Sequence, residues 1–124
     1  MPVRIFSARS FDRFARKERI GDAALVAAVA EMEAGLTGAE LGAGLFKKRI
    51  ARSDGGKSGG YRFVFCYRAE DRAVFLLGYA KNVQGTLAPA QEAVVRFLAN
   101  RYLAYSETEI SAAVADGELR EIGK

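Results

Sequence analysis

YRFVFCYRAEDRAVFLLGYAK, residues 61–81, is the segment of this 124-residue chain with the clearest structural signal. It contains two runs rich in aromatic and β-branched side chains, Tyr61–Arg68 and residues 73–81, joined by Ala-Glu-Asp-Arg. Runs of that length and composition are typical of strands, and so short a connection makes them antiparallel neighbours. The segment therefore predicts a β-hairpin at the centre of the fold.

The residues before the hairpin predict, in order, a strand, two helices, a glycine-rich loop and another strand. Ser7 is a typical N-cap residue, Asp22 can cap the second helix, and Gly35 suits the end of that helix. The expected ranges are residues 3–6, 7–19, 23–34, 36–45 and 45–52.

The residues after the hairpin predict two further helices and a short extended tail. The first helix should start near Pro89, within residues 87–103. Ser106 and Glu109 have the spacing of a capping box and predict a shorter helix to about residue 116. Residues 118–122 are expected to be extended.

The order of these elements predicts an α+β domain with helices over one face of an antiparallel sheet. Half of the residues are hydrophobic and 27% are charged, which is normal for a globular protein with one core. We therefore expect residues 1–124 to form a single domain, with a helical C-terminal extension from about residue 106.

Composition also excludes several classes of protein. One cysteine, Cys66, rules out an internal disulfide framework, and the absence of histidine rules out triads and metal sites that need imidazole. No apolar run reaches the length of a signal peptide or a membrane span. We expect a cytoplasmic protein with no membrane association, no cofactor and no bound metal.

Positive charge is concentrated in the middle of the chain. The net charge is +4, yet residues 44–81 hold nine basic and three acidic residues, a local net of +6. Such a region indicates an anionic partner, most often nucleic acid, or else a solvated strand surface that blunts a sheet edge. Charge alone leaves both interpretations open.

GGKSGG, residues 55–60, invites comparison with a phosphate-binding loop but does not fit one. The required glycine is replaced by Ala51, and a strand rather than a helix follows. A basic loop that closes over a polyanion and an ordinary hairpin connection both remain open.

Alternation of side chains along the strands predicts a cluster of cations on one sheet face. Phe46 and Ile50 should face the core, so Lys47 and Arg49 point away from it, and Lys48 is left on the apolar side. The same reasoning places Arg62 with Lys47 and Arg49. The alternative is an ordinary solvated face of an antiparallel sheet.

A histidine-free cluster of this kind could cleave RNA. The 2′-hydroxyl of RNA is itself the nucleophile, and guanidinium groups can stabilise charge on the phosphate. Tyr61 and Tyr79 could stack on splayed bases or donate a proton. A basic sheet that only binds RNA would have the same composition.

GLFKKRIARSDGGKSGGYRFVFCYRAEDRAVFLLGYAKN, residues 44–82, resembles the central region of RelE/HigB-like toxins of bacterial type II toxin–antitoxin systems, in the RelE/ParE superfamily. The flanks agree, so the resemblance covers nearly the whole chain. It implies a twisted antiparallel sheet with two N-terminal helices packed on one face, followed by C-terminal helices. It also implies an mRNA interferase that acts at the ribosome and is inhibited by a cognate antitoxin, expected to be of the helix-turn-helix type.

The resemblance also implies site residues. The expected catalytic residues are Lys47, Arg49, Arg62 and Lys81. The expected RNA-binding residues are Lys48, Arg52, Lys57, Tyr61, Tyr79 and Asn82. Better-studied members carry an arginine and a tyrosine near the position of Asn82, so the general acid stays unassigned.

Two other functions stay open on the sequence. One is a ParE-like toxin that poisons DNA gyrase, and the other is an inactive homologue that binds RNA or antitoxin. The antitoxin is expected to cover either the face with Lys47, Arg49 and Arg62 or the N-terminal helices.

Overall fold

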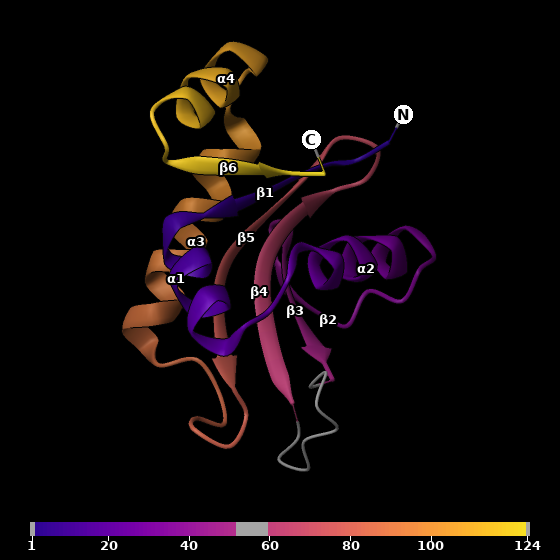
Figure 1. Ribbon diagram of the computed structural model, residues 1–124, viewed down its shortest axis with the longest axis vertical. Helices are drawn as coiled ribbons and strands as arrows, with labels where there is room; N and C mark the ends of the chain where they lie inside the picture. The colour runs from indigo at the N-terminus through magenta and orange to yellow at the C-terminus, as the bar shows by residue number, and fades with distance from the viewer. Residues whose placement is uncertain (1, 52–59, 124) are drawn as a thin grey trace.

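The computed structural model describes residues 2–51 and 60–123, and Figure 1 shows their arrangement. Arg52 and Lys57, both expected to bind RNA, lie outside the described residues, as does most of GGKSGG. The described helices are α1 (Arg9–Glu18), α2 (Asp22–Glu33), α3 (Pro89–Ala104) and α4 (Glu107–Ala115). The described strands are β1 (Arg4–Ala8), β2 (Ala39–Gly42), β3 (Leu45–Ile50), β4 (Tyr61–Arg68), β5 (Arg72–Ala80) and β6 (Leu119–Ile122).

The strands form one sheet in the order β2-β3-β4-β5-β1-β6. The predicted hairpin is confirmed, because β4 and β5 pair antiparallel along their length. The sheet is not wholly antiparallel as expected, because β1 pairs parallel with β5. A tight turn between two strands would make them antiparallel. The chain instead passes through α1 and α2 after β1, and a connection of that length allows β1 to pair parallel with β5.

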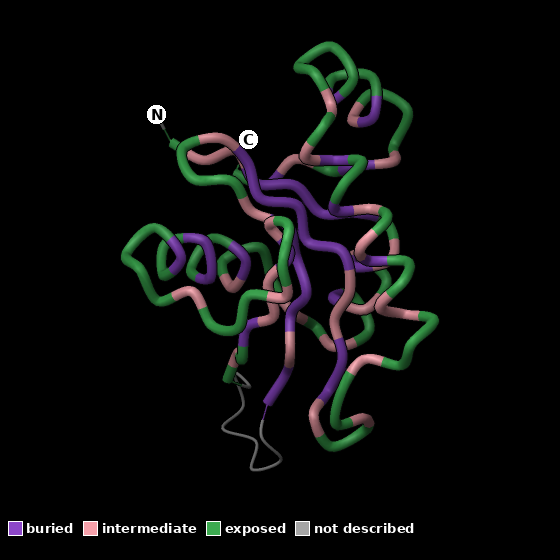
Figure 2. The backbone as a smooth tube through the Cα atoms, turned by 180° about the vertical axis from the view of Figure 1, so that it is seen from behind, coloured by how far each residue is buried: buried purple, intermediate pink, exposed green. Residues whose placement is uncertain are grey.

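Helices lie on both faces of the sheet (Figure 1), which corrects the expectation of helices over one face. α1 and α2 cover a cluster that includes Phe63, Phe65 and Phe75. α3 covers the other face, where its Val95 joins a cluster with Val64. Figure 2 shows the result, a buried central sheet between largely exposed helical surfaces. β4 is therefore apolar on both sides, as its continuous hydrophobic run indicates.

The glycine-rich segment before β3 contains a strand that the sequence did not predict. β2 pairs antiparallel with β3, with a register shift between Glu40 and Gly42. Gly38 has a φ of +68°, and a Cβ there would lie 2.7 Å from the carbonyl oxygen of Lys47. Glycine is needed for this close approach of two backbones, so the residues that suggested a loop instead allow an edge strand.

The C-terminal segment is part of the sheet. The predicted capping box is confirmed, since Glu109 N donates to Ser106 Oγ at 3.1 Å and Ser106 N donates to Glu109 Oε1 at 2.8 Å. The expected extended tail is β6, which pairs antiparallel with β1. Ser7 does not cap α1 as expected; its hydroxyl donates to Asp12 Oδ1 at 2.7 Å, and Ala8 precedes the helix.

Candidate functional site: a basic row across β3, β4 and β5

The predicted alignment of cations on one sheet face is confirmed. Arg49 on β3 lies directly opposite Arg62 on β4, and Lys47 lies on the same face two residues before Arg49. Arg62 in turn lies opposite Tyr79 on β5. We call Lys47, Arg49, Arg62 and Tyr79 the basic row. It is on the side of the sheet that also carries α3.

A β-bulge places Tyr79 in this row. Near the turn, Phe65 pairs with Phe75, whereas one step further Val64 pairs with Leu77, so Leu76 is the extra residue. Without the bulge, alternation would turn Tyr79 to the opposite face. The bulge also turns Gly78 toward α1, where a Cβ would overlap the ring of Phe14.

The two arginines of the basic row have different surroundings. Arg49 is exposed, whereas Arg62 is half-buried and donates from Nη1 to the carbonyl oxygen of Tyr61 at 3.3 Å. Like charges directly opposite each other in neighbouring strands destabilise a sheet. An anion that lies close to both guanidinium groups offsets this repulsion, as a bound phosphate would.

Tyr79 is buried and protonated. Its side chain is 5% exposed, and its hydroxyl has no hydrogen-bond partner in the part of the chain that the structure describes. Burial raises the pKa of Tyr79, against a smaller opposing effect from the charge of Arg62. A ring so deeply buried is not available in this structure for the base stacking we expected.

Lys81 and Asn82 follow directly after β5, at the end of the sheet where β4 begins. The backbone N of Lys81 donates to Gly60 O at 3.0 Å, and Lys81 Nζ donates to Gly85 O at 2.9 Å. Asn82 is exposed. Both residues therefore adjoin the basic row, but the ammonium group of Lys81 is directed into the turn that follows it.

Lys48 and Tyr61, both expected to contact RNA, lie on the opposite face of the sheet. Lys48 Nζ pairs with Glu31 Oε1 at 2.7 Å and donates to Leu36 O at 2.8 Å. Tyr61 is buried in the core beneath α1, and its hydroxyl donates to Glu18 Oε1 at 3.1 Å. Their partners hold them away from Arg49 and Arg62, so we leave both out of the RNA surface proposed below.

The described residues contain no group of three or more His, Cys, Asp or Glu side chains placed to hold a metal ion. Cys66 is a buried core residue, and burial raises the pKa of its thiol to about 12. Within the described ranges, no helix is both long and apolar enough to span a membrane.

Comparison with known proteins agrees with the fold. A family model described as the RelE toxin of the RelE/RelB toxin–antitoxin system matches residues 3–122. A search of curated proteins finds no match. Because the family match spans nearly all of the sequence, from β1 to β6, the chain belongs to the RelE family of toxins of toxin–antitoxin systems.

Proposed function

We propose that this toxin is an mRNA interferase, a metal-independent endoribonuclease that cuts ribosome-associated mRNA in the cytoplasm and so inhibits translation. The observation that carries the proposal is the pairing of Arg49 opposite Arg62 on one sheet face. Two guanidinium groups at adjacent strand positions can bind the two non-bridging oxygens of one phosphate. Membership of the toxin family supports the same conclusion.

The chemistry requires little beyond charge and position. The 2′-oxygen of the RNA forms a bond to the adjacent phosphorus, and the bond from phosphorus to the 5′-oxygen breaks. The products are a 2′,3′-cyclic phosphate and a 5′-hydroxyl, so one proton leaves the 2′-oxygen and one reaches the 5′-oxygen. Arg49 and Arg62 stabilise the negative charge that develops on the phosphate. The ammonium group of Lys47 supplies the proton to the leaving 5′-oxygen, and solvent water accepts the proton that leaves the 2′-oxygen.

The neighbouring residues extend this surface. Lys81 and Asn82 contact the RNA on the side of β5, next to Tyr79, which lies opposite Arg62. Arg52 and Lys57 belong to the segment between β3 and β4, and we propose that they add charge for RNA binding. We also propose that the antitoxin is of the helix-turn-helix type.

Substitution of one arginine in β4 tests the proposal against a matched control. We expect Arg62→Ala to abolish growth arrest on induction and to reduce RNA cleavage by about 10²–10³-fold, the usual cost of losing one transition-state donor. Arg68→Ala changes the same residue type in the same strand, but Arg68 is exposed and pairs with Asp71. It should keep both growth arrest and cleavage. Mapping of 5′-hydroxyl ends in cellular RNA measures the cleavage.

Two outcomes would contradict the mechanism. Growth arrest with intact transcripts and induced DNA damage would favour a gyrase-poisoning toxin. A parent protein that neither arrests growth nor cleaves RNA, but still binds the antitoxin, would be an inactive homologue.

A further inference from the structure

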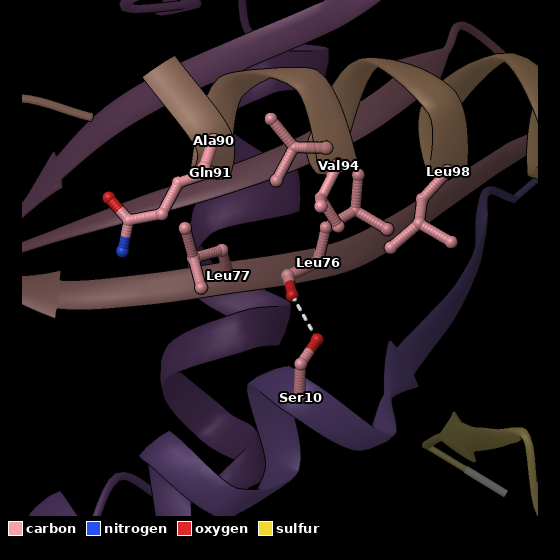
Figure 3. Close-up of a pocket in the computed structure, with 8 residues that line it drawn as sticks. Ser10, Leu76, Leu77, Ala90, Gln91, Val94 and Leu98 are labelled. Atoms are coloured by element: carbon pink, nitrogen blue, oxygen red, sulfur yellow. Dashed lines mark hydrogen bonds between the residues drawn. The ribbon is translucent and has the colours of Figure 1, made fainter. Parts of the chain in front are cut away.

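An apolar pocket opens between α1, β5 and α3, on a part of the surface that the proposed RNA cleavage does not use (Figure 3). Its volume is about 270 Å³. Most of the side chains that line it are aliphatic, and the hydroxyl of Ser10 is already engaged, since its Oγ donates to Leu76 O at 2.5 Å. The main lining residues are Ser10, Leu76, Leu77, Ala90, Val94 and Leu98.

The wall that α3 contributes continues into an exposed apolar stripe. Ala90, Val94 and Phe97 have the spacing of one helix face, and α3 packs on the sheet through Val95 and Ala99 instead. Val94 is 56% exposed and Phe97 is 63% exposed. A large exposed aromatic beside an apolar pocket is typical of a protein interaction site.

The side of α1 that continues from Ser10 is positively charged. Arg13 and Lys17 follow Ser10 at three and seven residues, so they lie along the same side of that helix. Both are exposed, and neither forms an ion pair within the described ranges. A second copy of this chain, with its net charge of +4, would bring like charges toward this side of α1. An acidic partner would complement it.

We propose that the antitoxin docks here through an amphipathic segment whose apolar side chains enter the pocket and cover Val94 and Phe97. Acidic side chains along its edge pair with Arg13 and Lys17 of α1. The proposal rests on membership of the toxin family and not on RNA cleavage. It assigns the antitoxin a surface separate from the basic row, so binding and catalysis can be lost independently.

The test uses the full-length antitoxin, identified as the product of an adjacent reading frame that abolishes growth arrest. We expect Phe97→Glu to weaken binding of that antitoxin by about tenfold or more, as truncation or charging of an interface anchor does. Arg13→Glu should weaken it as well. Val26→Glu is the matched control, because Val26 is an exposed apolar residue on α2. It should keep the affinity within about twofold of the parent.

Hydrogen exchange locates the contact independently of substitution. The antitoxin should protect amides of residues 90–98 and 10–17. Protection confined to β3 and the start of β4, or unchanged affinity of Phe97→Glu, would overturn the proposal. So would a dimer of the toxin alone that Phe97→Glu converts to monomer, because the occupant would then be a second copy.

Failure of this proposal is distinguishable from failure of the proposed function. Phe97→Glu should still arrest growth, since Phe97 lies outside the basic row, but the antitoxin should no longer neutralise it. Arg62→Ala should stop arresting growth and still bind the antitoxin with the affinity of the parent.

Discussion

Replacing Arg72 with alanine should be among the most destabilising single changes at a charged position of this protein. Arg72 is 4% exposed. Its Nη1 donates to the carbonyl oxygens of Tyr102 and Tyr105, both at 2.8 Å, and its Nη2 lies 3.2 Å from Glu107 Oε2. The two carbonyls belong to the C-terminal end of α3, where a helix leaves carbonyl groups without helical partners. Arg72 therefore links the C-terminal end of α3 to β5 through hydrogen bonds.

The expected loss in free energy of unfolding follows from the groups that have no hydrogen-bond donor once Arg72 is replaced by alanine. Two carbonyl groups at the end of α3 lose their donor, at about 1–3 kcal/mol for each one that stays buried. The carboxylate of Glu107 is 68% exposed and stays solvated, so the two carbonyl groups carry the cost, about 3–5 kcal/mol together. We expect Arg72→Ala to lower the free energy of unfolding by that amount, which corresponds to a fall in Tm of about 10–20 °C for a chain of this size.

Arg68→Ala is the matched control. Arg68 also pairs with Asp71, with 2.5 Å between Nη2 and Oδ2, but its side chain is 50% exposed. Exposed pairs contribute about 0–1 kcal/mol. Urea denaturation followed by circular dichroism measures both variants. If Arg72→Ala and Arg68→Ala lower the free energy of unfolding by amounts that agree within about 0.5 kcal/mol, the reasoning is refuted, because burial of the guanidinium would then have no effect.

Three further changes test other parts of the structure. Gly78→Ala should destabilise the fold by about 1–3 kcal/mol in urea denaturation, because its methyl group overlaps the ring of Phe14; unchanged stability would show that the ring moves freely. Burial raises the pKa of Asp12, but hydrogen bonds from Arg120 and Ser7 outweigh it and hold that pKa below its ordinary value of 3.8. The stabilisation from Asp12 is then present above pH 3.8 and lost as pH falls below it. The free energies of unfolding of the parent and of Arg120→Ala, measured against pH, should therefore converge in acid. A difference that stays constant with pH would contradict this. Because burial raises the pKa of the Cys66 thiol to about 12, that thiol should react with a disulfide reagent only on unfolding, and rapid labelling of the native protein would disprove its inertness.

Several features of the fold follow from short-range patterns. The β4–β5 hairpin, the two N-terminal helices and the capping box at Ser106 were predicted because each depends on residues close together in the chain. The same holds for the alignment of Lys47, Arg49 and Arg62. Alternation along each strand, together with the apolar residues that face the core, is sufficient to put all three on one face.

The role of each basic residue could not be predicted from local pattern. The segment with a local net charge of +6 contains Arg72, whose role the sequence alone does not separate from that of Arg49 or Arg62. Alternation put Lys48 on the apolar side but did not give its partner. In the structure Lys48 pairs with Glu31 of α2, and Arg72 binds the end of α3. Those partners are distant in the chain, so only the packing of helices on the sheet distinguishes structural cations from those available to a ligand.

The sequence alone was enough to specify an α+β domain, a central hairpin, three aligned cations and a family resemblance, because periodicity and turn chemistry act over a few residues. The parallel pairing of β1 with β5, the position of α3 and the placement of Tyr79 depended on contacts between distant segments. Tyr79 is the clearest case. A single extra residue at Leu76 reverses the face of every later residue in β5, and no feature of local composition marks that bulge.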